Sequence, residues 1–152
     1  VEAKAVDTKG RVHLFSNKGL GFTYRGNSLK KQMIFTEAVF KLKDGNKDDI
    51  LEKMAEINKK REDTQPIHDK TTGSTFANPE GYAAWKLIDD AELRGFTIGG
   101  ASMSTKHCNF MINDGTATAG DLEDLGEYVR KKVYMKSDIT LEWEVKRIGK
   151  KL

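Results

Sequence analysis

Polar and apolar positions alternate along the first quarter of the chain, in the two-residue period typical of β-strands. The pattern is clearest in residues 34–42, which are rich in β-branched and aromatic side chains. Shorter stretches of the same kind occupy residues 1–5 and 12–15, and Gly10 and Gly19 lie in the turn sequences that follow them. We therefore predict three strands, at residues 1–5, 12–15 and 34–42, with turns at residues 8–10 and 17–19.

Helical periodicity replaces this alternation after residue 47. The first predicted helix runs from residue 48 to about 61, and a second spans residues 82–93. A third helix follows Thr118, where Asp121 stands three residues later and completes a weak capping box. The apolar stripe of the first helix comprises Ile50, Leu51, Met54 and Ile57, and the inner face of the third comprises Leu122, Leu125, Val129 and Val133.

Extended segments are interspersed with these helices in the second half of the chain. We predict strands at residues 96–101, 109–112 and 139–148, the last because Ile139, Leu141, Trp143 and Val145 alternate along it. Residues 62–72 are polar, include Pro66 and read as a connector near a domain boundary. Helices packed on a small mixed sheet make the predicted fold class α+β.

Composition narrows the function classes without naming one. The 152 residues are 38% hydrophobic and 32% charged, as is ordinary for a soluble globular protein. The net charge of +3 is scattered along the chain, which argues against nucleic-acid binding and suits small anionic ligands such as phosphates. The single Cys108 excludes an intrachain disulfide, and the three histidines lack metal-ligand spacing.

Location and completeness are further expectations from the sequence. No apolar run approaches the roughly 20 residues of a membrane span, and the start of the chain does not read as a signal peptide. We therefore expect a cytoplasmic protein with no membrane partner. Because the chain opens on strand-like sequence at Val1, without Met, we expect it to be part of a longer protein.

The loop at residues 73–79, Gly-Ser-Thr-Phe-Ala-Asn-Pro, is the strongest candidate for chemistry. Gly73 permits backbone angles that other residues avoid, and Pro79 keeps Asn78 out of the helical region. Ser74 and Asn78 then present a hydroxyl and an amide. When the loop is taken alone, a surface turn with a helix cap explains it slightly better than a ligand site does.

Three other polar clusters accompany that loop. Tyr24-Arg25, with Ser28 close behind, suits a carboxylate or phosphate, because a guanidinium binds two oxygens at once. In residues 99–113, Lys106 is a candidate point charge for a diphosphate, whereas His107 reads as a structural histidine. Asn109 and Asn113 are expected to hold turns. Glu144 lies in the last predicted strand, and the sequence leaves open what it faces.

Together these four clusters resemble the UDP-N-acetylenolpyruvoylglucosamine reductases, also called UDP-N-acetylmuramate dehydrogenases. The resemblance runs from about residue 20 to 149 and is carried by four motifs in order. They are Tyr24-Arg25 with Ser28, Gly73-Ser74-Thr75-Phe76 with Asn78-Pro79, the Gly99-Gly100-Ala101 block up to Asn113, and Leu141 with Glu144-Val145 and Ile148-Gly149.

The resemblance implies an enzyme that uses NADPH and FAD to reduce UDP-N-acetylglucosamine enolpyruvate to UDP-N-acetylmuramate for peptidoglycan. It implies that residues 1–42 are the tail of an FAD-binding domain, 43–64 a connecting helix and 65–152 the substrate-binding domain. Most of the FAD site would then lie upstream of Val1, leaving this chain inactive alone. No obligate protein partner is implied.

The resemblance also assigns roles to residues. Ser74 would protonate the substrate, while Arg25 and Glu144 would flank its carboxylate as charge develops there. Tyr24, Asn78 and Lys106 would bind the substrate. Two positions depart from the family pattern: Ala77 stands where a basic residue is common, and Thr72 where a small residue is usual. The alternative function is a non-catalytic nucleotide-sugar binding module, which would need no acid at Glu144.

Overall fold

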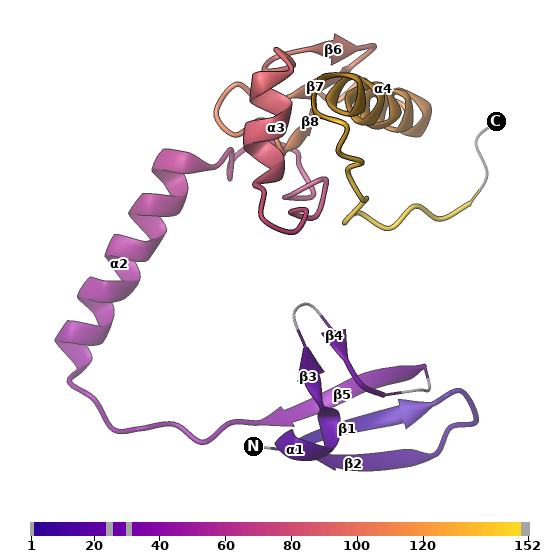
Figure 1. The fold of residues 1–152 in the computed structure, drawn as a ribbon. Helices are drawn as coiled ribbons and strands as arrows, with labels where there is room; N and C mark the ends of the chain where they lie inside the picture. The colour runs from indigo at the N-terminus through magenta and orange to yellow at the C-terminus, as the bar shows by residue number, and fades with distance from the viewer. Residues whose placement is uncertain (1, 24–25, 30–31, 150–152) are drawn as a thin grey trace. The chain divides into compact units, whose positions relative to one another are not determined.

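The computed structural model describes residues 2–23, 26–29 and 32–149, which fall into two compact units, residues 1–50 and 51–152. Figure 1 shows strands concentrated in the first unit and helices packed on a small sheet in the second. These elements confirm the predicted α+β class.

Unit 1 is built on a three-stranded antiparallel sheet in the order β2-β1-β5. Its strands are β1 (Glu2–Asp7), β2 (Val12–Ser16) and β5 (Met33–Val39), close to the ranges predicted. Residues 17–19, predicted as a turn, instead belong to the short helix α1 (Asn17–Leu20), because the Ser16 hydroxyl accepts a hydrogen bond from the Gly19 N–H and caps it. A two-stranded ribbon, β3 (Phe22–Thr23) with β4 (Gly26–Asn27), completes the unit.

Asp7 locks the turn between β1 and β2. Its Oδ1 accepts hydrogen bonds from the N–H groups of Lys9 (2.9 Å) and Arg11 (3.0 Å). Its Oδ2 lies 2.9 Å from the Arg11 guanidinium and 3.1 Å from His13 Nε2. The hydrogen bond from the Arg11 backbone, followed by the one from His13, holds the pKa of Asp7 well below its usual range.

Helix α2 (Lys47–Thr64) forms where the sequence predicts a helix and extends three residues into the predicted connector. Its apolar stripe, however, is not a buried face: Ile50, Leu51, Met54 and Ile57 are each about half exposed. Periodicity therefore identified the helix correctly but not a surface that covers it.

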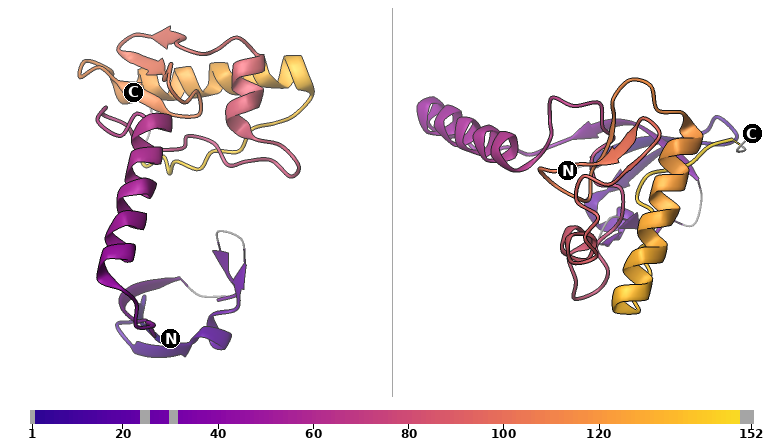
Figure 2. Two further views of the ribbon diagram at one scale, coloured as in Figure 1. Left: turned by 90° about the vertical axis from the view of Figure 1, so that its left-hand side faces the viewer. Right: turned by 90° about the horizontal axis from the view of Figure 1, so that it is seen from above.

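Unit 2 packs two helices around a second small antiparallel sheet, in the order β6-β7-β8. Figure 2 shows the long helix α4 lying along this sheet, with the shorter α3 beside it. The bounds are α3 (Ala84–Asp90), β6 (Thr97–Ile98), β7 (Ala101–Met103), β8 (Met111–Asn113) and α4 (Ala119–Ser137). The core between them includes Phe76, Ile88, Met103, Leu125, Val129, Val133 and Leu141.

Helix α4 confirms its prediction in detail. The Thr118 hydroxyl accepts a hydrogen bond from the Asp121 N–H (3.1 Å), and the Asp121 carboxylate accepts one from the Thr118 N–H (2.8 Å). This reciprocal capping box satisfies two groups that a helix start otherwise leaves unpaired. Leu125, Val129 and Val133 are fully buried on its inner face.

Three predicted elements of unit 2 differ in the structure. The second helix is shorter than residues 82–93, since α3 ends at Asp90. Residues 96–101 do not form one strand, because Gly99, with φ of +55°, and Gly100 turn the chain between β6 and β7. The strand predicted at residues 139–148 is wrong: this segment belongs to no strand and makes only an isolated bridge, between Trp143 and Phe76.

Candidate active site

Thr75 ties three distant segments together at the centre of the candidate loop. Its N–H donates to the Asn109 carbonyl (2.7 Å), and its carbonyl accepts from the Glu144 N–H (2.9 Å). Its buried hydroxyl accepts a hydrogen bond from the Met111 N–H (3.2 Å). The loop, the β8 segment and the C-terminal segment therefore share a fixed backbone framework.

The backbone of the neighbouring Phe76 is held by the side chain of Asn109, which bonds both its N–H and its carbonyl as an adjacent β-strand would. The Asn109 amide accepts a hydrogen bond from the Phe76 N–H (3.0 Å) and donates one to the Phe76 carbonyl (2.9 Å). Asn109 is only 3% exposed, and the fully buried Phe76 ring lies 5.0 Å from the Trp143 ring. Asn109 thus has a structural role, as expected, but its amide holds the backbone of Phe76 in the candidate loop rather than a turn of its own.

Ser74 and Glu144 lie on adjoining segments of this framework. Ser74 directly precedes Thr75 and pairs with Phe110 in an isolated bridge. Glu144 donates its N–H to Thr75, and both side chains are half-buried, with Glu144 Oε2 removed from solvent. The fold therefore brings together two candidate residues that are 70 positions apart in sequence.

A hollow of about 520 Å³ lies next to both segments within unit 2, although neither Ser74 nor Glu144 is among its lining residues. One wall is Thr71 and Thr72, just before the candidate loop, and another is the stretch from Val145 to Ile148. The first turns of α4 close a third side. Lys70, Lys146 and Arg147 line the hollow together with one acid, Glu123. Because Arg147 is paired with Glu127 outside the lining, the two lysines carry the excess positive charge that favours an anionic organic ligand.

Asn78 and Lys106 each have a structural contact. The Asn78 amide oxygen accepts a hydrogen bond from the Ala84 N–H (2.9 Å) at the start of α3. The exposed Lys106 donates through Nζ to the Glu62 carbonyl, near the end of α2, where helix carbonyls lack partners. Tyr24 and Arg25, the remaining two candidates, lie outside the described residues.

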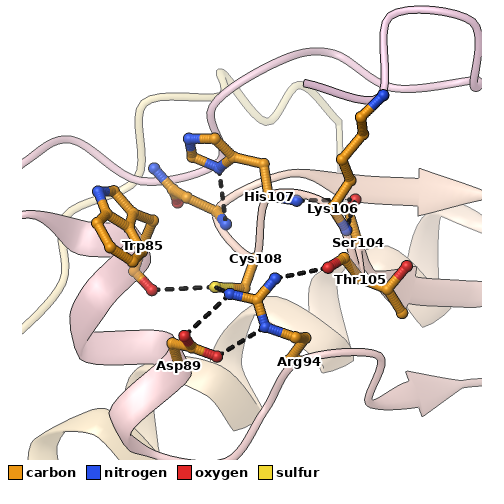
Figure 3. A network of polar contacts seen from close by, with 9 residues as sticks. Trp85, Asp89, Arg94, Ser104, Thr105, Lys106, His107 and Cys108 are labelled. Carbon is orange, nitrogen blue, oxygen red and sulfur yellow. Dashed lines mark hydrogen bonds and ion pairs between the residues drawn. The ribbon is translucent and has the colours of Figure 1, made fainter. Parts of the chain in front are cut away.

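Arg94 anchors the turn that carries Lys106 and His107 (Figure 3). Its guanidinium forms a two-point pair with the Asp89 carboxylate (2.8 and 2.9 Å) and donates to the Thr105 carbonyl (2.5 Å). It also lies 3.5 Å from the Cys108 sulfur. The hydrogen bond from Arg94 lowers the pKa of Asp89, so the pair stays ionised and clasps the turn to α3.

Cys108 and His107 are structural members of this turn. The Cys108 thiol is fully buried and donates to the Trp85 carbonyl (3.0 Å), and burial raises its pKa, so it is no thiolate nucleophile. Burial lowers the pKa of His107, and the positive charge of Arg94 lowers it further. The neutral His107 ring packs 4.6 Å from Phe110, which agrees with the structural role predicted for it.

Other kinds of site find no support in the described part of the chain. No cluster of three or more histidine, cysteine or carboxylate side chains is arranged there to hold a metal ion. Nor does any helix within those residues combine the length and apolar character that crossing a bilayer requires.

Comparison with known proteins places this framework in a family. Residues 65–148, more than half of the chain, match the family model described as UDP-N-acetylenolpyruvoylglucosamine reductase, C-terminal domain. The chain belongs to this reductase family. The matched range includes Ser74, Asn78, Lys106 and Glu144.

Individual reductases extend the match beyond that domain. The chain is 57% identical over 150 residues to UDP-N-acetylenolpyruvoylglucosamine reductase of Rickettsia bellii (strain RML369-C), covering 99% of this chain and 50% of the relative. The Rickettsia prowazekii (strain Madrid E) reductase is also 57% identical, with coverage of 99% and 51%. The crystal structure of the Thermus caldophilus reductase matches with a TM-score of 0.78 at 34% identity, over 94% of this chain and 51% of that one. The chain thus spans about half the length of the curated relatives it matches.

Sequence reasoning missed several residues that shape this reductase-family site. Arg94 and Asp89 gave no local signal, since an arginine five residues after an aspartate is common on protein surfaces. Gly126 did give one, because a glycine inside a helical pattern weakens the helix and calls for a reason. That reason is the indole of Trp143, which lies where a side chain at position 126 would lie.

Proposed function

We propose that this chain is the C-terminal part of a cytoplasmic enzyme that reduces UDP-N-acetylglucosamine enolpyruvate to UDP-N-acetylmuramate, a precursor of peptidoglycan. The observation that carries the proposal is the joining of the Ser74 and Glu144 segments at the Thr75 carbonyl. Family membership supports a reductase, and the cationic hollow beside these segments suits a substrate with a carboxylate and two phosphates.

The proposal divides the work between the parts of the chain. Residues 1–42 would complete an FAD-binding domain, 43–64 would connect, and 65–152 would bind the UDP-sugar. A hollow of about 410 Å³ in unit 1, lined by Leu20, Phe22 and Phe35, suits a flat aromatic ring. Because the described lining of this hollow offers an acid, Glu37, and no cation, the hollow would suit the ring portion of FAD rather than its pyrophosphate.

Bound FAD, reduced by NADPH, supplies the hydride for the enolpyruvyl double bond. Ser74 would donate the proton that the substrate's α-carbon takes up, because its half-buried hydroxyl stands at the head of the fixed Thr75 framework. Glu144 and Arg25 would flank the substrate carboxylate, where negative charge develops. Glu144 can assist there only as a hydrogen-bond donor in its protonated form, whereas Arg25 offsets the charge directly.

The nucleotide end of the substrate would be bound by Tyr24, Asn78 and Lys106. Asn78 uses its amide oxygen to bind the Ala84 N–H, so its NH₂ group remains able to donate to the substrate. Lys106 uses one N–H of its ammonium group to bind the Glu62 carbonyl, and the other two can donate to the substrate. The Arg94 clasp would keep Lys106 in place on its turn. Ala77 supplies no cation where the family commonly has a basic residue. Lys70 and Lys146, which line the hollow, would therefore contribute more of the positive charge that binds the phosphates.

The test is a Ser74→Ala change in the full-length protein, followed by separate measurement of the two half-reactions. Reduction of the flavin by NADPH should be nearly unchanged, while reduction of the enolpyruvyl substrate should slow by about 10²–10³-fold. Equal slowing of both half-reactions would remove Ser74 from the role of proton donor. If the intact protein binds the nucleotide sugar but never oxidises NADPH, it is a binding module and not a reductase.

A further inference from the structure

Helix α4 contains a buried glycine, Gly126, directly against the C-terminal segment. A β-carbon added to Gly126 would lie 1.9 Å from Cη2 and 2.3 Å from Cζ2 of Trp143. Neither atom is the free end of a flexible chain, because both belong to the rigid indole. Gly126 therefore creates the space in which the ring of Trp143 sits.

Glu127, the next residue, fixes the polar edge of that ring. Its Oε1 accepts hydrogen bonds from Trp143 Nε1 (3.0 Å) and from the Arg147 guanidinium (3.1 Å), which also stacks 4.6 Å from the indole centroid. Its Oε2 accepts from Arg130 (2.7 Å), and Arg130 in turn donates to the Leu141 carbonyl (2.8 Å). The segment is thus held to α4 on both sides of Trp143.

Burial alone would raise the pKa of Glu127, but the hydrogen bonds from Trp143 and Arg130 outweigh it and lower that pKa. Glu127 is therefore ionised at neutral pH, as an acceptor for three donors must be. The indole also packs against the ring of Phe76, with the ring centroids 5.0 Å apart, and Asn109 holds the backbone of Phe76 in place. Trp143 consequently links α4 to the candidate loop.

We propose that Gly126 and Glu127 are positioning residues that seat Trp143 and so hold Glu144 beside the Ser74 loop. Trp143 immediately precedes Glu144, so the position of its indole sets the backbone from which the Glu144 N–H reaches Thr75. The inference rests on the proposed function, in which Glu144 and Ser74 act on the substrate. It adds two residues of α4 that do not line the hollow of unit 2.

Gly126→Ala in the full-length enzyme is the main test. Alanine normally strengthens a helix interior relative to glycine, so a purely local effect would leave the enzyme as active and more stable. The proposed seat predicts the opposite: displacement of Trp143 should slow substrate reduction by about 10–100-fold. Flavin reduction by NADPH should be nearly unchanged, because Glu144 takes no part in it.

A second background makes the test specific to the indole. In a Trp143→Leu enzyme the space beside position 126 is free, so adding Gly126→Ala should cause no further slowing. Glu127→Gln keeps an acceptor for Trp143 and should slow substrate reduction less than Glu127→Ala does. Lys131→Ala, at an exposed position of the same helix, is the matched control and should leave the rate unchanged.

The outcomes separate this inference from the function beneath it. An intact unmodified enzyme that fails to reduce the substrate overturns the proposed function, and this inference with it. An active enzyme whose Gly126→Ala form keeps its rate, or loses both half-reactions equally, overturns the positioning role alone. Should Gly126→Ala not fold, the two Glu127 variants decide, and equal rates for Glu127→Ala and the unmodified enzyme overturn the role.

Discussion

Each of the two units of this chain is stabilised internally in a different way. In unit 2, helices and a small sheet enclose a continuous apolar core around Phe76 and Leu125. In unit 1, among the residues that the structure describes, only Ala5 and Leu20 are buried apolar side chains, while Leu14 and Ile34 are about 70% exposed. Unit 1 instead has a polar cluster in which the Asp7 carboxylate contacts the side chains of Arg11 and His13.

This difference bears on where a site can be rigid. A side chain in a close-packed core has few alternative positions, whereas a half-covered sheet can shift against whatever covers it. Ser74 and Glu144 are both attached to the core of unit 2 through Thr75, Phe76 and Trp143. We therefore expect Ser74 and Glu144 to be held more rigidly than side chains on the sheet of unit 1.

The largest expected effect comes from removing the ring that joins that core to the site. Phe76→Ala should destabilise unit 2 by about 3–5 kcal/mol, because the ring is fully buried between Trp143 and the core. Both tryptophans of the chain lie in unit 2, so tryptophan fluorescence during chemical denaturation reports on that unit.

Phe22→Ala is the matched change in unit 1. Because the Phe22 ring is 64% exposed, its loss should alter stability by less than about 1 kcal/mol, measured by hydrogen exchange of the β1 amides. Comparable losses at Phe22 and Phe76 would mean that unit 1 has a core of its own, and the contrast between the units would fail.

A smaller effect is expected at a pair of asparagines. Asn109→Ala leaves the buried N–H and C=O of Phe76 without their partner and should cost about 2–4 kcal/mol. Asn27→Ala in unit 1 removes one exposed hydrogen bond, to the Leu29 N–H, and should cost less than about 1 kcal/mol. The same denaturation and exchange measurements compare them, and a negligible loss at Asn109 would show that water replaces its amide.

Much of this framework could be predicted from sequence where one element determines its own shape. Helix α4 was predicted because its capping residues and apolar spacing are local. The sequence also marked out the Ser74 loop, since Gly73 permits a positive φ and Pro79 restricts the backbone of Asn78, whatever surrounds them. Glu144 was named only through family resemblance, and the sequence did not show that it would meet Thr75.

The sequence was less informative about which other parts of the chain a segment would pack against. Alternating apolar residues at 139–148 indicated a strand, but Leu141 and Trp143 bury themselves against α4 and Phe76 with a single bridge to the loop. The spacing of apolar residues on α2 predicted its apolar stripe, but it did not show whether that stripe would be covered, and no described residue of the helix is buried. A sequence pattern states which side of a segment is apolar, and the three-dimensional neighbours decide what that side meets.

The smallest expected effect is a difference between the two units in how their stability depends on pH. Because the pKa of His107 lies below its ordinary value of 6.5, the unfolded chain binds more protons there than the folded one as pH falls. The stability that neutral His107 contributes is thus present above about pH 6.5 and is lost as pH falls through the lowered pKa. For Asp7 in unit 1 the pKa is also lowered, but from 3.8, so its contribution persists until pH falls below about 4.

Between pH 7 and 5, therefore, His107 should weaken unit 2 slightly while the Asp7 contribution to unit 1 stays constant. Denaturation midpoints followed by tryptophan fluorescence across this range measure the first effect, and exchange of the β1 amides measures the second. His107→Gln should flatten the dependence in unit 2, because glutamine does not titrate. An unchanged slope in that variant would assign the pH dependence to other groups and remove His107 as its source.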